Sequence, residues 1–551
     1  MATFRVDPSQ DSFGSYISRG NYYVDKSEMI YRYLSESFVS NILFTRPRRF
    51  GKTMIMTMFR CFLDNCQDSK DLFKGLKVMK YEDFVQQNMN KWPVVFLSFK
   101  DVKGANYEKV YEAFRGKIAE VFRYHSYLLG SDDLDEGDKR KFNSLKEEKE
   151  SEGGTISGLA FLCEMLRKHH KKSVFVIIDE YDVPIASAVG SNSYDSICEL
   201  IEKMLSSVCK TNFNVEAVMI SGCLYTVGLN NIQPNSVLSN QYSDCFGFTE
   251  DEVQQVLSAA GLSDMFDEVR DWYDGYIFGK THIYNPWDVM KYVKHAKEDG
   301  LDDLPLPFWL NTSEANEEMV KGFIGKTEDA LESFEMLLSG KSITKVLNEN
   351  VPYHRLHESG ANLWTGLLET GYLTKATERG RRGTVSLRIP NMEIREVFRK
   401  EIWDFFENRV DIVKVTEFIN ALWSANVLAA TSALDIILES TVSCFHAYHE
   451  YTYHLVLDGF FTGQICRVRS EFETGYGRSD LVVTDIARNR ALVLELKHAE
   501  NEGSLDASLV EACDQIKAKK YESSLVYDGY TYIRKYGMAF WNRRCLIQEL
   551  K

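Results

Sequence analysis

The segment EFETGYGRSDLVVTDIARNRALVLELK, residues Glu471–Lys497, has the residue pattern of a β-hairpin. Asp480 begins a run of β-branched and apolar residues that ends near Ile486, and a second apolar run extends from Ala491 to Lys497. The residues between the two runs are mostly polar, as they are in turns. The segment therefore predicts two antiparallel strands joined by a short connection.

The register of this hairpin decides which side chains meet. If the turn is centred between residues 487 and 488, Asp480 lies directly opposite Glu495, with Cβ atoms about 4.5–5.5 Å apart. Strand alternation places Lys497 on the face of Glu495 and turns the neighbouring Leu494 and Leu496 toward a core. The sequence thus predicts that two carboxylates and an ammonium group converge on one spot.

Two carboxylates and a lysine suit a magnesium site. Magnesium is usually held by one or two carboxylates together with phosphate and water. The lysine can position or deprotonate a water molecule, or offset charge that develops on a phosphate. An edge hairpin whose charges only face solvent is the alternative. The apolar surroundings of Glu495 and Lys497 in VLELK, and the tight GYGR entry at residues 475–478, favour the catalytic interpretation.

GYGRSD followed by LELK resembles the PD-(D/E)XK nuclease superfamily, in which the acidic residue and the E-x-K triplet carry phosphodiester hydrolysis. The resemblance implies that Asp480 and Glu495 are metal ligands and that Lys497 is the third catalytic residue. Ser479 stands where the superfamily name has proline, a position that varies among its members. The resemblance also suggests three secondary candidates: Glu473, Gln515 and Glu450.

Length and composition limit the class of protein. A chain of 551 residues is long enough for two to four domains, and 44% hydrophobic with 26% charged residues is typical of globular proteins. The longest apolar runs have strand length and the first residues lack a secretory pattern, so we expect neither a transmembrane helix nor a membrane partner. Eleven cysteines without a CxxC pair predict a reducing compartment, the cytoplasm or, in a eukaryote, the nucleus.

The formal net charge of −15 opposes non-specific binding to nucleic acid, because phosphate contacts supply much of that affinity. The acidity lies mostly upstream, in residues 131–138 and 146–152, whereas residues 441–551 are nearly neutral. Five arginines flank the predicted hairpin site, so the net charge still allows a local basic groove there. They are Arg467, Arg469, Arg478, Arg488 and Arg490.

The segment NILFTRPRRFGKTMIMTMFRCFL, residues 41–63, predicts a strand, a loop and a helix in the order of a phosphate-binding loop. Lys52 would reach the β- and γ-phosphates and Thr53 would ligate magnesium. The helix that begins at Gly51 would direct its first backbone amides at the anion. Arg46 stands where the common form of this loop has its first glycine.

The segment SVFVIIDEYD, residues 173–182, predicts a buried parallel strand with acids at its carboxyl end. Asp179 would hold the magnesium shell and Glu180 would orient the attacking water. The alternative, a strand that ends in a solvated acidic turn, is disfavoured by the pairing with RPRRFGKT. Strands are also expected at 93–99 and 215–221, and Ser221 at the end of the latter would sense the γ-phosphate.

Nine blocks resemble, in the same order, an AAA-ATPase-like family that is usually fused to a C-terminal PD-(D/E)XK nuclease. They are YYVDKSEMI, RPRRFGKT, VFVIIDEYD, FGFTEDEV, WYDGYIFG, YNPWDV, FWLNTS, LLETGYLT and LRIPNMEIREVF. RPRRFGK followed by Ser or Thr is the usual phosphate loop of that family. The resemblance therefore places Arg46, Arg48 and Arg49 in the nucleotide site and implies ATP and Mg²⁺ as cofactors, with Mn²⁺ as an alternative at the nuclease site.

The expected architecture is α/β and has three parts. Residues 1–245 form a P-loop NTPase domain of the additional-strand class, with a parallel sheet between helices. Residues 246–405 form a helical lid and a winged-helix-like region whose basic turn at 378–382 either binds DNA or belongs to the lid. Residues 406–551 form linker helices and a restriction-endonuclease-like α/β domain. The charged stretch 131–154 is expected to be an exposed or partly disordered loop.

The leading hypothesis is an ATP-binding and ATP-hydrolysing protein coupled to a magnesium-dependent nuclease. Its expected partner is nucleic acid, with DNA favoured over RNA, and its expected setting is defence or mobile-element biology. Assembly into a homo-oligomer is an open alternative. The alternative is a STAND-like switch or scaffold in which the nuclease-like domain only binds nucleic acid or partners. A third interpretation, that both sites have decayed, is disfavoured because the core residues of both sites are present.

Overall fold

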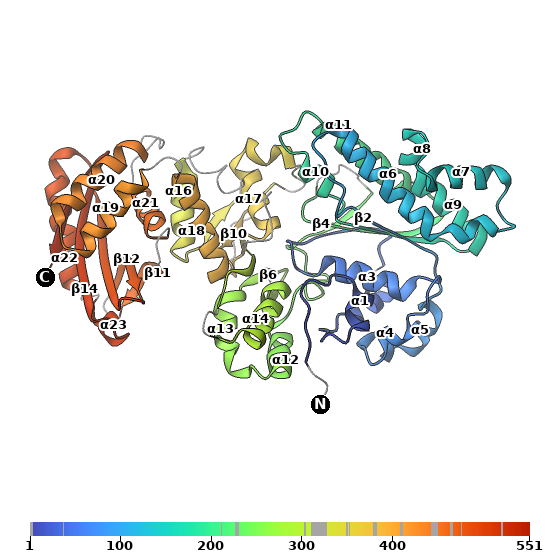
Figure 1. Ribbon diagram of the computed structural model, residues 1–551, viewed down its shortest axis with the longest axis horizontal. Helices are drawn as coiled ribbons and strands as arrows, with labels where there is room; N and C mark the ends of the chain where they lie inside the picture. The colour runs from blue at the N-terminus through green and yellow to red at the C-terminus, as the bar shows by residue number, and fades with distance from the viewer. Residues whose placement is uncertain are drawn as a thin grey trace. The chain divides into compact units, whose positions relative to one another are not determined.

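The computed structural model divides the chain into two compact units (Figure 1). The first unit comprises Met1–Ala315, Lys345–Val385 and Pro390–Glu393. The second unit comprises Asn316–Thr344, Ser386–Ile389 and Ile394–Lys551. The residues that the structure describes are 4–36, 38–210, 212–225, 231–301, 305–309, 328–348, 351, 353–377, 383–407, 411–441, 450–462, 467–474, 477–519 and 522–550. The predicted domain boundaries at 245 and 405 stay a prediction.

A five-stranded parallel sheet, with the strand order β2-β3-β4-β1-β5, forms the centre of the first unit. Its strands are β1 (Asn41–Thr45), β2 (Val94–Ser98), β3 (Val174–Asp179), β4 (Val215–Gly222) and β5 (Gln233–Asn235). β3 is buried along its whole length, as expected for an apolar strand in a covered parallel sheet. β4 lies between β1 and β3, which confirms the predicted additional-strand class.

Helices cover both faces of this sheet (Figure 1). On one side lie α6 (Tyr107–Tyr124), α9 (Gly158–His170) and α11 (Tyr194–Cys209). On the other side lies α3 (Lys52–Leu63), the helix that follows β1. The predicted strand, loop and helix at residues 41–63 are therefore confirmed.

The charged stretch at residues 131–154 is not the loop that its composition predicts. It contains α7 (Glu136–Lys146), and α8 (Glu152–Ile156) begins within it. Phe142 of α7 is fully buried, and its ring centre lies 4.9 Å from that of Phe122. The correction has a simple physical reason: a helix needs only a narrow apolar stripe to pack, and a high overall charge does not prevent one.

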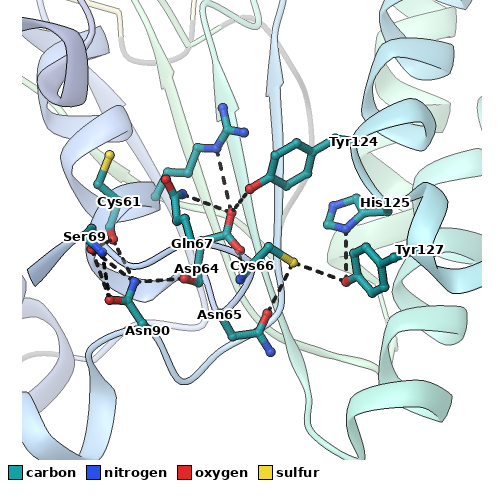
Figure 2. A network of polar contacts seen from close by, with 11 residues as sticks. Cys61, Asp64, Asn65, Cys66, Gln67, Ser69, Asn90, Tyr124, His125 and Tyr127 are labelled. Atoms are coloured by element: carbon teal, nitrogen blue, oxygen red, sulfur yellow. Dashed lines mark hydrogen bonds and ion pairs between the residues drawn. The ribbon is translucent and has the colours of Figure 1, made fainter.

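A polar network surrounds the end of α3 (Figure 2). Asp64, which follows this helix, is fully buried, and its carboxylate accepts hydrogen bonds from Tyr124 Oη at 2.7 Å and from the Cys66 backbone N–H at 2.9 Å. The Asn90 side-chain amide donates to the Asp64 carbonyl oxygen at 2.9 Å. A buried carboxylate is stable when its oxygens are hydrogen-bonded, so this network fixes the end of the helix that begins at the phosphate loop.

Residues 246–298 add helices and aromatic loops to the first unit. The elements are α12 (Glu250–Ala260), α13 (Phe266–Tyr273), β6 (Tyr276–Phe278), β7 (Thr281–Ile283) and α14 (Pro286–Glu298). Thr249 and Glu252 form the capping box that opens α12. The rings of Tyr276 and Phe278 lie 4.9 and 5.0 Å from the ring of Phe50 in the phosphate loop. These aromatic residues therefore pack against the phosphate loop.

The segment expected to resemble a winged helix contains a helix, two strands and a second helix in that order. These are α17 (Gly360–Thr370), β9 (Thr374–Lys375), β10 (Val385–Arg388) and α18 (Met392–Glu407). The basic turn at 378–382 lies outside the described residues. DNA binding by this segment stays a prediction.

A second five-stranded sheet, with the order β11-β12-β13-β14-β15, forms the core of the second unit. Its strands are β11 (Arg467–Thr474), β12 (Gly477–Asp485), β13 (Arg490–His498), β14 (Tyr532–Trp541) and β15 (Arg544–Leu550). All neighbours are antiparallel except β13 and β14, which are parallel. The predicted hairpin, β12 and β13, therefore occupies the middle of a sheet and is not an edge.

The helices that pack on this sheet come from two parts of the chain, one before the first strand and one between β13 and β14. The parallel crossover between β13 and β14 runs through α22 (Leu505–Lys519). Before the sheet come α19 (Ile412–Trp423), α20 (Val427–Thr441) and α21 (Glu450–Thr462). Tyr536 of β14 bonds to the Leu422 carbonyl, and the Cys545 N–H donates to Asp435 at 2.9 Å. The helices expected to be linkers thus belong to the core of this unit.

Candidate nucleotide and metal sites

The phosphate loop turns sharply just before α3. Gly51 has a φ of 81° and Arg49 a φ of 70°, both in the left-handed region. Glycine adopts this conformation without the steric cost that a Cβ brings, whereas an arginine must be held there by its surroundings. Lys52 Nζ donates to the carbonyl oxygens of Arg46 and Pro47, both at 2.9 Å. The ammonium group therefore lies against the loop and is held by neutral acceptors, which leave its charge available for a phosphate.

Thr53, Asp179 and Ser221 meet at the carboxyl edge of the parallel sheet. Thr53 Oγ1 donates to Asp179 Oδ2 at 2.8 Å, and the Ser221 hydroxyl donates to Asp179 Oδ1. Asp179 is fully buried. Burial raises the pKa of this carboxyl above its ordinary value, although the two hydrogen bonds and the charge of Lys52 act in the opposite direction.

This arrangement passes a geometric test for magnesium. Neighbouring ligands of an octahedral magnesium ion, each about 2.1 Å from it, lie about 3.0 Å apart. The Thr53 hydroxyl and the Asp179 carboxylate are oxygen donors separated by 2.8 Å. Both side chains can therefore coordinate one magnesium ion without moving far.

Glu180 follows Asp179 in a strained backbone conformation. Its φ is 54°, which is unusual for a residue other than glycine. Burial, followed by the charge of Asp179, raises the pKa of its carboxyl. The next turn is held by Asp182, whose Oδ2 accepts hydrogen bonds from the backbone N–H groups of Cys223 at 2.7 Å and Leu224 at 3.1 Å. Strain maintained by such contacts is a frequent property of catalytic positions.

The hairpin in the second unit has the predicted register. Leu481 pairs with Leu494, and the pairing continues to Asp485 with Arg490. One step beyond the first of these pairs, Asp480 stands opposite Glu495. The pairing of Leu481 with Leu494 confirms the predicted turn position, and the convergence of the Asp480 and Glu495 carboxylates stays a prediction.

Asp480 is held by two neighbouring elements. Its Oδ2 accepts a hydrogen bond from the Leu496 N–H at 2.7 Å and lies 3.7 Å from His454 Nε2 of α21. Burial alone would raise the pKa of this carboxyl, but His454, the Leu496 N–H and the charge of Lys497 together lower it below its ordinary value. The Asp480 carboxylate is therefore ionised at neutral pH, as a metal ligand must be.

Glu495 is fully buried and faces α22. Ala491 and Val493 on the same strand pack with Ile516 of that helix, and strand alternation places Glu495 and Lys497 on the same face. Gln515, the residue before Ile516, is partly buried, so α22 brings this secondary candidate to the correct side of the sheet.

A glycine that the sequence analysis does not identify allows this packing. Gly537 of β14 pairs with Glu495 on the neighbouring strand. A Cβ atom at Gly537 would lie 2.7 Å from Cys513 Sγ of α22, closer than van der Waals contact allows. The absence of a side chain at Gly537 therefore lets α22 approach the sheet beside the candidate site.

Two family models match the chain. Residues 9–230 match the model of a predicted AAA-ATPase, and residues 448–550 match the PD-(D/E)XK nuclease superfamily. The chain joins an AAA-ATPase-like domain to a PD-(D/E)XK nuclease domain. The curated "Uncharacterized protein in vnfD 5'region" of Azotobacter chroococcum mcd 1 is 24% identical over 486 residues, which cover 84% of this chain and 83% of that protein. The two domains support an ATPase combined with a nuclease-type hydrolase.

Arg46 of the ATPase domain requires a correction. Its side chain is fully buried, and its guanidinium group donates to the Asn235 carbonyl oxygen at 2.7 Å and to Asn235 Oδ1 at 2.8 Å. The guanidinium carbon also lies 4.9 Å from the centre of the Phe246 ring. Burial lowers the pKa of Arg46 to about 10. Arg46 thus anchors the loop to β5 and to residues 246–278 and does not extend toward the nucleotide.

Arg49 and Arg48 differ from Arg46. Arg49 is exposed, and its guanidinium carbon lies 4.0 Å from the centre of the Trp287 ring. Arg48 is partly exposed. Phosphate contact by these two arginines stays a prediction, as does the sensor role of Ser221, whose hydroxyl bonds to Asp179 here.

The arginines of the hairpin turn also require a correction. Arg488 Nη1 and Arg490 Nε lie 3.1 and 2.9 Å from Asp485 Oδ2. Asp485 is five residues along β12 from Asp480, a separation of about 17 Å at 3.4 Å per residue. Because the turn is the far end of the hairpin, these two arginines stabilise the turn and do not flank the site.

His454 is the contact residue that the sequence analysis misses in the nuclease domain. The one indication in the sequence is YHEYTYH, where His454 follows Glu450 by one helical turn. Of the secondary candidates, Glu473 pairs with Arg478 in the strand register and Glu450 is the first residue of α21, and their side chains lie outside the described set.

Two features are missing from the described ranges of the chain. No group of three or more His, Cys, Asp or Glu side chains there is arranged to hold a metal ion. A magnesium ion needs fewer protein ligands, because it keeps several waters and shares phosphate oxygens. None of the helices in the described part of the chain combines the length and the apolar character that crossing a bilayer requires.

Proposed function

We propose that this protein binds and hydrolyses ATP with magnesium in its first unit. We further propose that it cleaves nucleic acid at a magnesium-dependent site in its second unit, with DNA favoured over RNA as the substrate. The observation that carries the proposal is that one chain builds both oxygen-donor sites. Thr53 and Asp179 are 2.8 Å apart in the first, and Asp480 stands in register with Glu495 in the second. Defence or mobile-element biology is the setting that the family resemblance favours.

In the ATPase site each residue has a separate task. Thr53 and Asp179 would ligate the magnesium ion, which offsets the charge of the phosphates when it is bound. Lys52 would contact the β- and γ-phosphates from its position against the loop. Glu180 orients the attacking water, whose oxygen forms a bond to the γ-phosphorus as the bond to the ADP oxygen breaks.

In the nuclease site, Asp480 and Glu495 would hold magnesium, or manganese as an alternative, whose charge polarises the scissile phosphate. Lys497, on the face of Glu495, positions the attacking water and offsets charge on the phosphate. Water adds to phosphorus and the bond to one ester oxygen breaks, which leaves a phosphate monoester and a free hydroxyl group. His454 Nε2, which lies 3.7 Å from Asp480 Oδ2, would stabilise the ionised carboxylate when the imidazole is protonated.

The test is cleavage of plasmid DNA, single-stranded DNA and RNA by the full chain, with Mg²⁺, Mn²⁺ or EDTA and with or without ATP. Wild type is compared with Glu495→Gln, which keeps the size of the side chain, and with Glu500→Gln, an exposed glutamate five residues further along. We expect Glu495→Gln to lose cleavage and Glu500→Gln to retain it. Cleavage that survives Glu495→Gln, or that is absent under every condition, would refute the nuclease assignment.

A further inference from the structure

Lys100 stands beside the residue that we assign to water activation. Ser98 at the end of β2 pairs with Asp179 at the end of β3, and the Phe99 N–H donates to the Asp179 carbonyl oxygen at 2.9 Å. Lys100 is the next residue on one chain segment and Glu180 the next on the other. Neighbouring strands lie about 4.8 Å apart, so Lys100 and Glu180 follow the ends of two adjacent strands at the same edge of the sheet.

The N-terminal segment around Asp11–Phe13 also contacts Lys100. Asp11 forms an ion pair with Lys100. Two residues later, the Phe13 N–H donates to Thr57 Oγ1 at 3.0 Å on α3, the helix that begins at Lys52. Phe13 is fully buried. Asp11 is therefore held next to the ATPase site by a segment that is itself anchored on the phosphate-loop helix.

The ion pair is too exposed to be explained by stability. The side chains of Lys100 and Asp11 are 56% and 48% exposed, and ion pairs in such positions contribute about 0–1 kcal/mol. Charges at the same edge nonetheless act on one another. The hydrogen bond with Asp11 raises the pKa of Lys100, as does the charge of Glu180, while Lys100 opposes the burial that raises the pKa of Glu180.

We propose that Lys100 is a positioning residue for Glu180 and that Asp11 restrains Lys100, so that the N-terminal segment sets the rate of ATP turnover. Lys100 attracts the Glu180 carboxylate and thereby limits the orientations from which it can hold the attacking water. The pair with Asp11 competes for the same ammonium group. This inference rests on the proposed ATPase function. It adds a control element outside the phosphate loop and the acidic strand.

The test is steady-state ATP hydrolysis by the full chain with Mg²⁺, recorded as separate kcat and KM values. The variants are Lys100→Ala, Lys100→Arg and Asp11→Asn, with Lys103→Ala as a matched control because Lys103 is exposed on the same loop. We expect Lys100→Ala to lower kcat about tenfold with KM within twofold of wild type, because misplacing a water-orienting group slows chemistry without weakening binding. Lys100→Arg restores most of the loss, and Asp11→Asn raises kcat.

The outcomes separate this inference from the function on which it rests. A wild-type chain that does not hydrolyse ATP would overturn both. A wild-type chain that hydrolyses ATP, together with Lys100→Ala behaving like Lys103→Ala or raising KM in place of lowering kcat, would overturn only the role of Lys100. Asp11→Asn with a kcat at or below that of wild type would overturn the restraint. Equal melting temperatures for all variants would confirm that the comparison concerns folded protein.

Discussion

The buried acid pair of the first unit makes folding stability depend on pH. Asp288 of α14 and Glu393 at the start of α18 are 1% and 0% exposed. Glu393 Oε1 accepts a hydrogen bond from the Trp309 N–H at 2.7 Å. Burial raises the pKa of Glu393 from 4.5 to about 7. Burial also raises the pKa of Asp288, and the charge of Glu393 raises it further, whereas the charge of Arg49 lowers it. One proton is therefore retained by the pair under conditions in which an unfolded chain has lost it.

The sign and size of the effect follow from this shift. Between pH 4.5 and about 7 the folded state holds a proton on Glu393 that the unfolded state does not, so the free energy of unfolding falls as pH rises through this window. The stabilisation that the protonated Glu393 gives to the folded state is complete below pH 4.5 and lost above about pH 7. At about 1.4 kcal/mol per pKa unit, the shift corresponds to roughly 3 kcal/mol. Glu393→Gln keeps the shape of the neutral acid and removes the titration.

Urea unfolding followed by tryptophan fluorescence at pH 5 and pH 8 measures this difference. The free energy of unfolding of wild type should fall by about 2.5 kcal/mol more between the two pH values than that of Glu393→Gln, because the substitution removes the titration of Glu393 and the charge that raises the pKa of Asp288. Glu298→Gln is a suitable control, because Glu298 is an exposed glutamate at the end of α14. If wild type and Glu393→Gln change in parallel with pH, the pair does not titrate as its burial implies.

Three further substitutions test individual positions. Arg46→Ala should lower the free energy of unfolding by about 2–4 kcal/mol, because it removes buried charged hydrogen bonds. The KM for ATP should stay unchanged, and a raised KM with intact stability would instead identify Arg46 as a nucleotide ligand. His454→Ala should slow nucleic-acid cleavage by about tenfold or more without affecting ATP turnover, and equal cleavage rates would exclude His454 from the site. Gly537→Ala should cost about 1–3 kcal/mol in thermal unfolding through its clash with Cys513, and an unchanged melting temperature would show that α22 can move away.

Strand positions and hairpin register are the features of this molecule that the residue periodicity of its sequence predicts. The register that pairs Asp480 with Glu495 follows from the turn position and the two-residue period of strands, both of which are readable in the sequence. The existence of β1, β3 and β4 follows from apolar runs, and their order in the sheet follows from the resemblance to P-loop ATPases that the GKT and DE segments support. By contrast, β5 has the sequence Gln-Pro-Asn and is recognisable only through its pairing with β1.

Roles that depend on distant contacts are the ones that sequence reasoning misassigns. Arg46 has the residue type of a phosphate ligand, yet Asn235 and Phe246 capture its guanidinium group. Arg490 lies close to Glu495 in sequence but at the opposite end of the hairpin. His454 becomes part of the site only because α21 packs against β12. Each case requires the tertiary structure, because sequence distance and residue type do not determine which partner a polar group reaches.

We expect the ATPase domain to separate positions that set nucleotide binding from positions that set turnover. The phosphate-loop helix is restrained at both ends: Lys52 is bound to loop carbonyls, and Asp64 is held by Tyr124 and the Cys66 N–H (Figure 2). Glu180, in contrast, has a strained backbone and its charged neighbour Lys100 is bonded to a different segment. Changes at the helix should therefore appear in KM and in stability, whereas changes around Lys100 should appear in kcat. Under the proposed function, this division would make the N-terminal segment a regulator of rate and not of affinity.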